Sequence, residues 1–152
     1  MTAGDEVTRN EETVRRFIEE VGNNHNPDVI EEVIAPTSVE HPMSYSSHLL
    51  PGEESMSPGE AMRIHLAFME RNYTNLHTAI DRLFGAGDMV TVVGTDTGMR
   101  GGKPITVKWI SVARLEDGKI VESWDLLDRL GLYQQLGVVP ETPVLAEQAG
   151  LK

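Results

Sequence analysis

The feature that most constrains the fold is a change in hydrophobic period near the middle of the chain. Before about residue 72, apolar residues recur every three or four positions, which is typical of amphipathic helices. Beyond residue 76, apolar and β-branched residues form four extended runs separated by short, glycine-containing gaps. Such gaps join neighbouring strands as hairpins, so the strands pair antiparallel. The four predicted strands are residues 76–84, 89–97, 105–115 and 120–127.

Three helices are predicted before the strands and one after them. Thr8 and Glu11 have the spacing of a capping box near the start of the first helix. Asn26 can cap the second helix, and Ser57, followed by Pro-Gly-Glu, begins the third. A short closing helix is predicted over 129–136. Helices that precede an antiparallel run of strands indicate an α+β domain.

The chain length of 152 residues fits a single domain with its own core. We expect a flexible leader over residues 1–9, the folded domain over 10–140 and a tail over 141–152. Residues 37–56 are rich in serine, proline and glycine. They are therefore predicted to form a long loop over the mouth of a pocket, with a short strand near Glu40.

The composition argues against several functional classes. The formal net charge is −11, which disfavours binding to nucleic acid or to anionic membranes, because both require a basic surface. The chain has no cysteine, which removes disulfides, thiol nucleophiles and thiolate metal sites. The five histidines lack the close spacing of metal ligands. No run has the length of a membrane span, and the first residues lack the apolar core of a signal peptide, so a cytoplasmic location is expected.

The segment from Asp117 to Asp125 reads Asp-Gly-Lys-Ile-Val-Glu-Ser-Trp-Asp. Together with Gln-Leu-Gly over 135–137, it resembles the C-terminal signature of SnoaL-like polyketide cyclases, and Gly-Thr-Asp-Thr-Gly over 94–98 resembles a strand motif of the same family. This family lies in the nuclear-transport-factor-2-like superfamily, and the resemblance covers about residues 10–140. It implies a cone-shaped α+β barrel with three N-terminal helices packed on a curved, mostly antiparallel sheet. A deep pocket and a homodimer or higher homo-oligomer are implied as well.

The resemblance also implies a chemistry. SnoaL-like cyclases close a polyketide ring by intramolecular aldol chemistry without metal or cofactor. Their acid/base aspartate lies five residues after the Gly-Lys-Ile triplet, a position that is Asp125 here, and a partnering histidine corresponds to Ser111. The related limonene-type epoxide hydrolases add a second aspartate, which matches Asp96, and an arginine, which is replaced by Gly94. The implied partner is a small hydrophobic organic substrate.

Asp125 is also the leading acid/base candidate from its own surroundings. Its neighbours Trp124, Leu126 and Leu127 are apolar. Burial among apolar groups favours the neutral form of a carboxyl group and can tune it for proton transfer. One positioned carboxyl group can remove a proton beside a carbonyl and return one to the new alkoxide. The alternative is an aspartate near a strand end that faces water.

The residues that face Asp125 depend on the turn near residue 117. A two-residue loop would place Ile110 opposite Asp125, whereas a three-residue loop would place Trp109 there. A one-residue slip exchanges the two faces of a strand. The family comparison favours the second pairing, which puts Trp109, Ser111 and Ser123 into the pocket as substrate-binding residues. An indole there suits a flat aromatic substrate.

Other polar side chains have less determined roles. His41 precedes a proline and can act as a catalytic group that hydrogen-bonds a substrate carbonyl, or it is a surface loop histidine. Asp96 is either solvated at a strand edge or a second catalytic carboxyl group. Three more residues are candidates for substrate binding, with simple packing roles as the alternative: His65 on an apolar helix stripe, His77 at the start of a strand and Tyr45 at the pocket mouth.

These patterns suggest three functions. The first is a cofactor-independent cyclase that closes rings by acid/base catalysis on a polyketide-like substrate, with Asp125 as the acid/base. The second is an epoxide-opening enzyme, which needs Asp96 and Asp125 to converge from one face of the sheet. The third is a non-catalytic ligand-binding or dimerising module, because one fold hosts many functions. A hydroxylating role also stays open.

Overall fold

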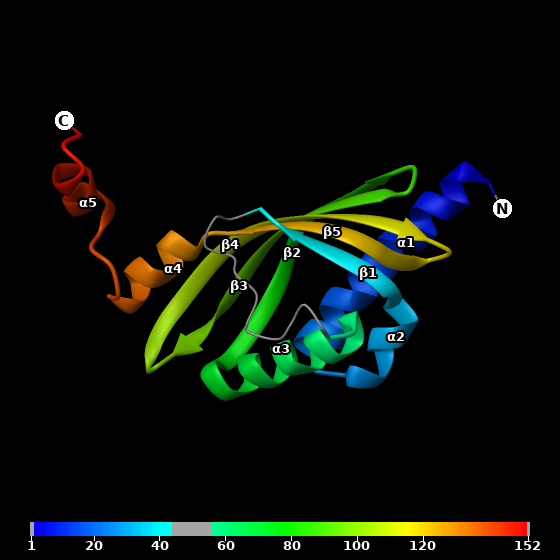
Figure 1. Cartoon of the computed structure of the whole chain (residues 1–152), viewed down its shortest axis with the longest axis horizontal. Helices are drawn as coiled ribbons and strands as arrows, with labels where there is room; N and C mark the ends of the chain where they lie inside the picture. The colour runs from blue at the N-terminus through cyan, green and yellow to red at the C-terminus, as the bar shows by residue number, and fades with distance from the viewer. Residues whose placement is uncertain (1, 44–55, 152) are drawn as a thin grey trace.

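The computed structural model describes residues 2–43 and 56–151, which form a curved sheet with helices on one face (Figure 1). Within this part of the chain the sheet has five strands in the order β1-β5-β4-β3-β2. β1 pairs with β5 in parallel, and the other neighbours pair antiparallel. The strands are β1 (Ile34–Pro42), β2 (Thr74–Ala86), β3 (Met89–Arg100), β4 (Lys103–Glu116) and β5 (Lys119–Leu127).

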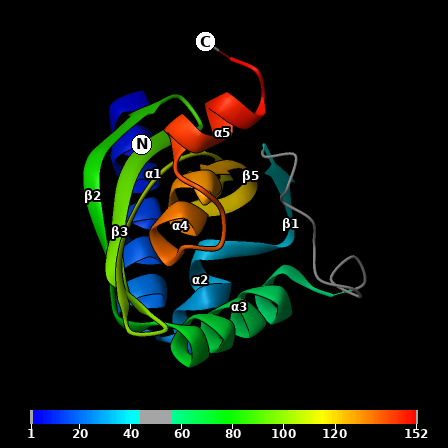
Figure 2. The same ribbon diagram turned by 90° about the vertical axis from the view of Figure 1, so that its left-hand side faces the viewer.

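The helices lie mainly on the concave side of this sheet. Figure 2 looks onto α4, with β2 and β3 curving along one side and α3 lying beneath. The α+β fold is confirmed, but the sheet is open at β1 and β2 and does not close into a barrel. The helical segments are α1 (Ala3–Arg16), which continues as a π-helix (Phe17–Asn23), a 3₁₀ turn (Pro27–Val29) leading into α2 (Ile30–Val33), α3 (Pro58–Asn72), α4 (Arg129–Leu136) and α5 (Thr142–Gln148).

The N-terminal helix begins earlier than predicted. The Thr2 hydroxyl accepts the Asp5 N–H at 3.2 Å, and the Asp5 carboxylate accepts the Thr2 N–H at 2.8 Å. This reciprocal pair is a capping box, and it lies upstream of the one predicted at Thr8. Thr8 instead donates its hydroxyl to the Gly4 carbonyl within the helix. Residues 3–9, which were expected to be flexible, are therefore helical.

Two further boundaries differ from the prediction. The strand expected near Glu40 already begins at Ile34, directly after α2 ends at Val33. Helix α5 occupies much of the predicted tail. The predicted caps at Asn26 and Ser57 are confirmed, because each side chain accepts a backbone N–H from the first turn that follows it. No helix among the described residues has the length and apolarity needed to cross a membrane.

The main core lies between α1 and the concave face of the sheet. Val14 and Ile18 belong to the same buried cluster as Val90 and Val92 of β3. Complete burial of such a side chain stabilises a fold by about 1.5–3 kcal/mol. Because side chains alternate along a strand, the even-numbered residues of β3 face the helices. Phe17, where the π-helix begins, packs against this cluster and against a second one between the helices.

The turn between β4 and β5 is the two-residue loop. Asp117 and Gly118 both have positive φ values, 50° and 76°, which is the geometry of a type I′ hairpin turn. Beyond the turn, Val121 has no partner across the ladder, and the register shifts there. Val121 is therefore a β-bulge that changes the pairing by one residue.

This bulge decides what faces Asp125. Ser111 lies opposite Asp125, so both predicted partners, Ile110 and Trp109, were wrong. The predicted face is nevertheless right for Trp109, because Trp109 and Ser111 are two residues apart on one strand and share a side. The alternation of apolar residues does not reveal a bulge of this kind. The residue opposite Asp125 could therefore not be predicted from the turn alone.

Candidate active site

Polar side chains from four strands project from the concave face beside the main core. Val92 belongs to that core and pairs with Ser111, which in turn pairs with Asp125. Directly paired residues lie on the same face of a sheet, and so does every second residue along a strand. The concave set comprises Thr78, Asp96, Trp109, Ser111, Ser123 and Asp125.

Asp96 is a half-buried carboxyl group held by two donors. Its Oδ1 accepts the Thr78 hydroxyl at 2.8 Å and the Trp109 indole N–H at 2.9 Å. Burial raises the pKa of Asp96 above its ordinary value. The two hydrogen bonds and the charges of His65 and His77 lower this pKa, but burial outweighs them. Asp96 is therefore more readily protonated than a free aspartate, as an acid catalyst requires.

Trp109 reaches Asp96 because Gly94 leaves room for its ring. Gly94 pairs with Trp109 across β3 and β4. A Cβ atom at Gly94 would lie 2.2 Å from the indole Cζ2 and 2.4 Å from Cε2, which no packed structure tolerates. The indole thus fills the space that the arginine of the epoxide hydrolases would need at Gly94. Where the resemblance implies an arginine, the group that donates to Asp96 is instead the indole N–H of Trp109.

Asp125 lies on the same face as Asp96, with Trp109 on the strand between them. The Ser123 hydroxyl donates to Asp125 Oδ2 at 2.9 Å. The Met43 N–H donates to the Asp125 carbonyl at 3.1 Å, which ties this part of β5 to the end of β1. Asp125 is half-buried, and its pairing with Ser111, which pairs with the core residue Val92, places it on the concave face. The two carboxyl groups meet the same-face condition of an epoxide-opening enzyme.

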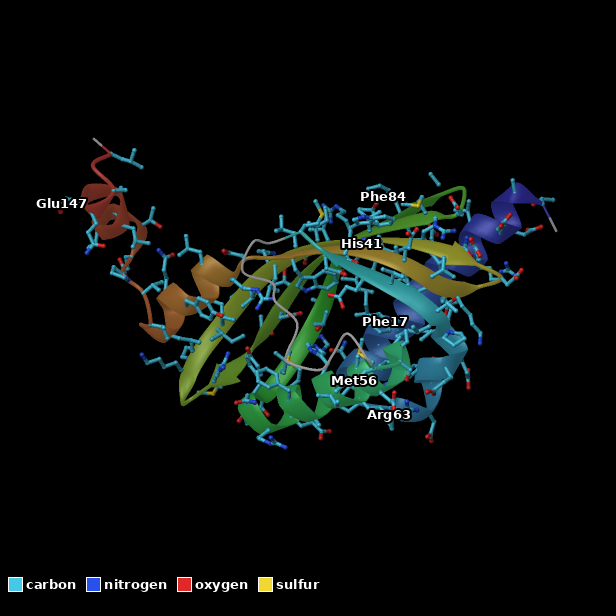
Figure 3. The ribbon with its side chains drawn as sticks, viewed as in Figure 1. Phe17, His41, Met56, Arg63, Phe84 and Glu147 are labelled. Carbon is cyan, nitrogen blue, oxygen red and sulfur yellow. The ribbon has the colours of Figure 1, made fainter. Side chains whose placement is uncertain are left out.

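His41 does not face Asp125. It pairs with Trp124 of β5, and its ring stacks on that indole with centroids 5.1 Å apart. Because Trp124 and Asp125 are consecutive in a strand, His41 lies on the outer face. His41 Nε2 is 3.4 Å from Glu122 Oε1, and Glu122 accepts the Arg114 Nε–H at 2.7 Å. Figure 3 shows His41 and Phe17 on opposite sides of the sheet, so His41 does not share the face of Asp125, and its predicted catalytic role stays a prediction.

The remaining predicted residues divide between the two faces. His65, on α3, is exposed but acts electrostatically on Asp96. His77 pairs with Thr97 on the outer face and is also exposed. Tyr45 lies outside the described residues. Of the predicted substrate-binding residues, Trp109, Ser111 and Ser123 therefore lie on the concave face.

The sequence reasoning did not identify Thr78. The pair next to the turn between β2 and β3 is Ala86 and Met89. If the pairing continued from there without interruption, Ala79 would lie opposite Asp96. Asp81 has no partner across the ladder, and this irregularity shifts the pairing so that Thr78 lies opposite Asp96. The only available signal was a hydroxyl residue in the strand adjacent to the candidate aspartate.

Two surface hollows lie away from these residues. One of about 380 Å³ lies between α4 and α5, and one of about 540 Å³ runs along α1. Neither is lined by Asp96 or Asp125, so the pocket predicted around Asp125 stays a prediction. Among the residues that the structure describes, no group of three or more histidine and acidic side chains is arranged to hold a metal ion.

Comparison with known proteins agrees with this architecture. A predicted polyketide cyclase from Bacillus cereus ATCC 10987 has 25% identity and a TM-score of 0.73, over 87% of this chain and 83% of that chain. An LEH-like epoxide hydrolase from M. tuberculosis has 18% identity and a TM-score of 0.67, over 95% and 98% of the two chains. AclR, a predicted hydroxylase from Streptomyces galilaeus, has 16% identity and a TM-score of 0.71, over 95% and 90%.

The last two similarities concern the fold alone. No significant match was found among curated proteins. The family model of the SnoaL-like polyketide cyclases matches residues 12–136, which include every strand of the described sheet as well as Asp96 and Asp125. The protein therefore belongs to the SnoaL-like polyketide cyclase family.

Proposed function

We propose that the protein is a cofactor-independent cyclase that closes a ring in a hydrophobic, polyketide-like substrate by acid/base chemistry of the aldol type. One observation carries the proposal: Asp96 and Asp125 project from the same concave face, and burial raises the pKa of Asp96. Two carboxyl groups in different environments suit the two proton transfers of such a reaction.

The roles follow from the contacts of each carboxyl group. Asp125, oriented by the Ser123 hydroxyl, removes a proton from the carbon beside a substrate carbonyl. The resulting enolate carbon attacks a second carbonyl carbon, which forms the new C–C bond and leaves an alkoxide. Asp96 donates its proton to that alkoxide. A proton then passes from Asp125 to Asp96 through solvent, so the reaction is an isomerisation with no net proton uptake.

Trp109 supports the same proposal as a binding surface. Its indole lies on the concave face between the two aspartates, held by the hydrogen bond to Asp96 and by the close approach to Gly94. A fixed aromatic ring favours stacking with a flat, conjugated substrate. Ser111 lies opposite Asp125 where the cyclases have a histidine, so proton transfer here would involve the serine hydroxyl or Asp96.

The test uses aromatic β-keto esters that carry a second carbonyl within reach of ring closure. Chromatography separates the cyclised isomer, whose mass is unchanged, from the open form. Asp125→Asn and Asp96→Asn should each lose at least about 100-fold in rate, as expected for removal of an acid or base. The matched control is Asp88→Asn, since Asp88 is exposed in the turn after β2. Full turnover by both site variants would refute the proposal, whereas binding of these esters without turnover by the parent protein would favour a binding module.

Epoxide opening is the second candidate, and the shared face of Asp96 and Asp125 is the observation in its favour. Trp109 over Gly94 counts against it, because no guanidinium can occupy that space. Incubation of an epoxide in ¹⁸O-labelled water distinguishes the two. A labelled diol would establish hydrolysis, whereas an unlabelled cyclic ether would indicate ring formation by an internal hydroxyl group.

A further inference from the structure

A second layer of contacts lies behind Asp96. The amide of Asn23, the last residue of the π-helix, bridges the backbone of Thr78 in β2. Asn23 Oδ1 accepts the Thr78 N–H at 2.8 Å, and Asn23 Nδ2 donates to the Thr78 carbonyl at 2.9 Å. The Thr78 hydroxyl in turn donates to Asp96 Oδ1 at 2.8 Å. The π-helix is thus joined to the candidate acid through one threonine.

The bridge lies where β2 needs support. β2 is an edge strand, and its pairing with β3 is irregular on both sides of Thr78, before His77 and after Ile80. Only the short stretch 77–80 keeps a continuous register between the two irregularities. The Asn23 amide forms hydrogen bonds with both the N–H and the carbonyl of Thr78 at the open edge of the sheet. A neighbouring strand would satisfy these two backbone groups in the same way. It therefore fixes the backbone from which the Thr78 hydroxyl projects.

The π-helix is what delivers Asn23 to this edge. Its wider turn is marked by the Asn24 N–H, which bonds the Glu19 carbonyl at 3.0 Å. Phe17 and Val21 hold the same segment against the buried clusters, so its position is set by packing. π-helical segments are uncommon and occur frequently at functional sites.

From these contacts we infer that Asn23 is a positioning residue for Asp96, acting through Thr78 to hold one donor on Oδ1. The inference rests on the proposed function for its catalytic meaning. The contacts themselves predict a property of the free protein. A hydroxyl that donates to a carboxylate favours its charged form, so loss of Asn23 should release Thr78 and raise the pKa of Asp96.

The test needs no substrate. Trp109 donates directly to Asp96, so its fluorescence reports the protonation of that carboxyl group. A Trp124→Phe background leaves Trp109 as the only indole, because the chain has two tryptophans. The pH titration of this background defines the midpoint for Asp96, and adding Asp96→Asn should abolish the transition.

Thr78→Val should move the midpoint to higher pH, and Asn23→Ala should move it in the same direction. The double variant should titrate like Thr78→Val alone, because both changes remove the same donor. Asn24→Ala, at the exposed neighbouring position, is the matched control and should leave the midpoint unchanged. Urea unfolding of each variant records stability separately.

A purely structural role for Asn23 would lower stability and leave the midpoint in place, and that result would overturn the inference. Fully additive shifts in the double variant would overturn it as well. If Asn23→Ala does not fold, Asn23→Ser carries the same test, since a serine hydroxyl cannot bridge both backbone groups of Thr78. Failure of the cyclisation assay leaves this measurement intact, so the two proposals are tested independently.

Discussion

Substituting Gly94 by alanine tests how tightly the indole of Trp109 is held over β3. The new Cβ would lie 2.2 Å from Cζ2 of the ring, whereas carbon atoms in contact are about 3.5–4.0 Å apart. The ring would have to retreat by more than about 1 Å to restore contact distance. Its 2.9 Å hydrogen bond to Asp96 would break. Overpacking costs about 1–3 kcal/mol, and loss of a hydrogen bond to a charged group costs about 1.5–3 kcal/mol.

We therefore expect Gly94→Ala to lower the free energy of unfolding by at least about 2 kcal/mol, measured by urea denaturation followed by circular dichroism. Gly22→Ala is the matched control, because a Cβ there would be 3.8 Å from its nearest neighbour, the Phe17 carbonyl oxygen. That control should be neutral or slightly stabilising.

A double-mutant cycle attributes the loss to the ring. In a Trp109→Ala background the space over Gly94 is empty, so adding Gly94→Ala should cost much less than it does in the parent protein. The coupling between the two changes should be in the upper part of the usual range of about 0.5–3 kcal/mol for residues in contact. A Gly94→Ala protein with parental stability and unchanged Trp109 fluorescence would refute the packing argument.

Three further changes have definite expected outcomes. Burial raises the pKa of Asp96 in the folded protein above the ordinary value of an aspartate. The stability that the protonated form contributes is therefore fully present below the pKa of the unfolded state and is lost as the pH rises through the raised pKa of the folded state. Asp96→Asn should accordingly be more stable than the parent at pH 7, and the two should converge near pH 3 in urea titrations. Asp128→Ala should destabilise by about 1 kcal/mol in the same assay, because Asp128 caps α4 by accepting the Gly131 N–H. The homodimer or higher homo-oligomer stays a prediction, and Ile110→Lys should shift it toward smaller species in sedimentation experiments, since Ile110 is 39% exposed on the outer face beside Leu126. An unchanged sedimentation coefficient would refute a role of this face in assembly.

Much of the fold could be predicted because the dominant signals were local. The switch from helical to alternating periodicity located four of the five strands of the described sheet, and Ser57 marked the start of α3. The start of α1 was missed because two capping boxes with the same spacing compete, at Thr2 and at Thr8, and the upstream one begins the helix. Most of β1 was missed because its pairing with β5 is parallel and distant in sequence, which no turn signal reports.

The site was predicted less completely because the positions of its side chains depend on how the strands pair. Asp125 and Asp96 could be singled out from motif positions, but their surroundings depend on register, which a single inserted residue changes. His41 was assigned to the pocket because it precedes a proline near a loop. Its pairing with Trp124 places it on the other face. The parallel pairing of β1 with β5 was not predicted, and without it the sequence does not indicate which face of the sheet His41 occupies.

Both candidate carboxyl groups owe their surroundings to a β-bulge. Without the unpaired Val121, the two-residue turn would align Asp125 with Ile110 and turn it to the outer face, away from Trp109. If Asp81 were not an extra residue in the pairing of β2 with β3, Ala79 would lie opposite Asp96 in place of Thr78. Bulges often lie next to active sites, where they redirect a side chain. Two of them, in β5 and in β2, here determine which side chains lie opposite the two residues that the proposed chemistry requires.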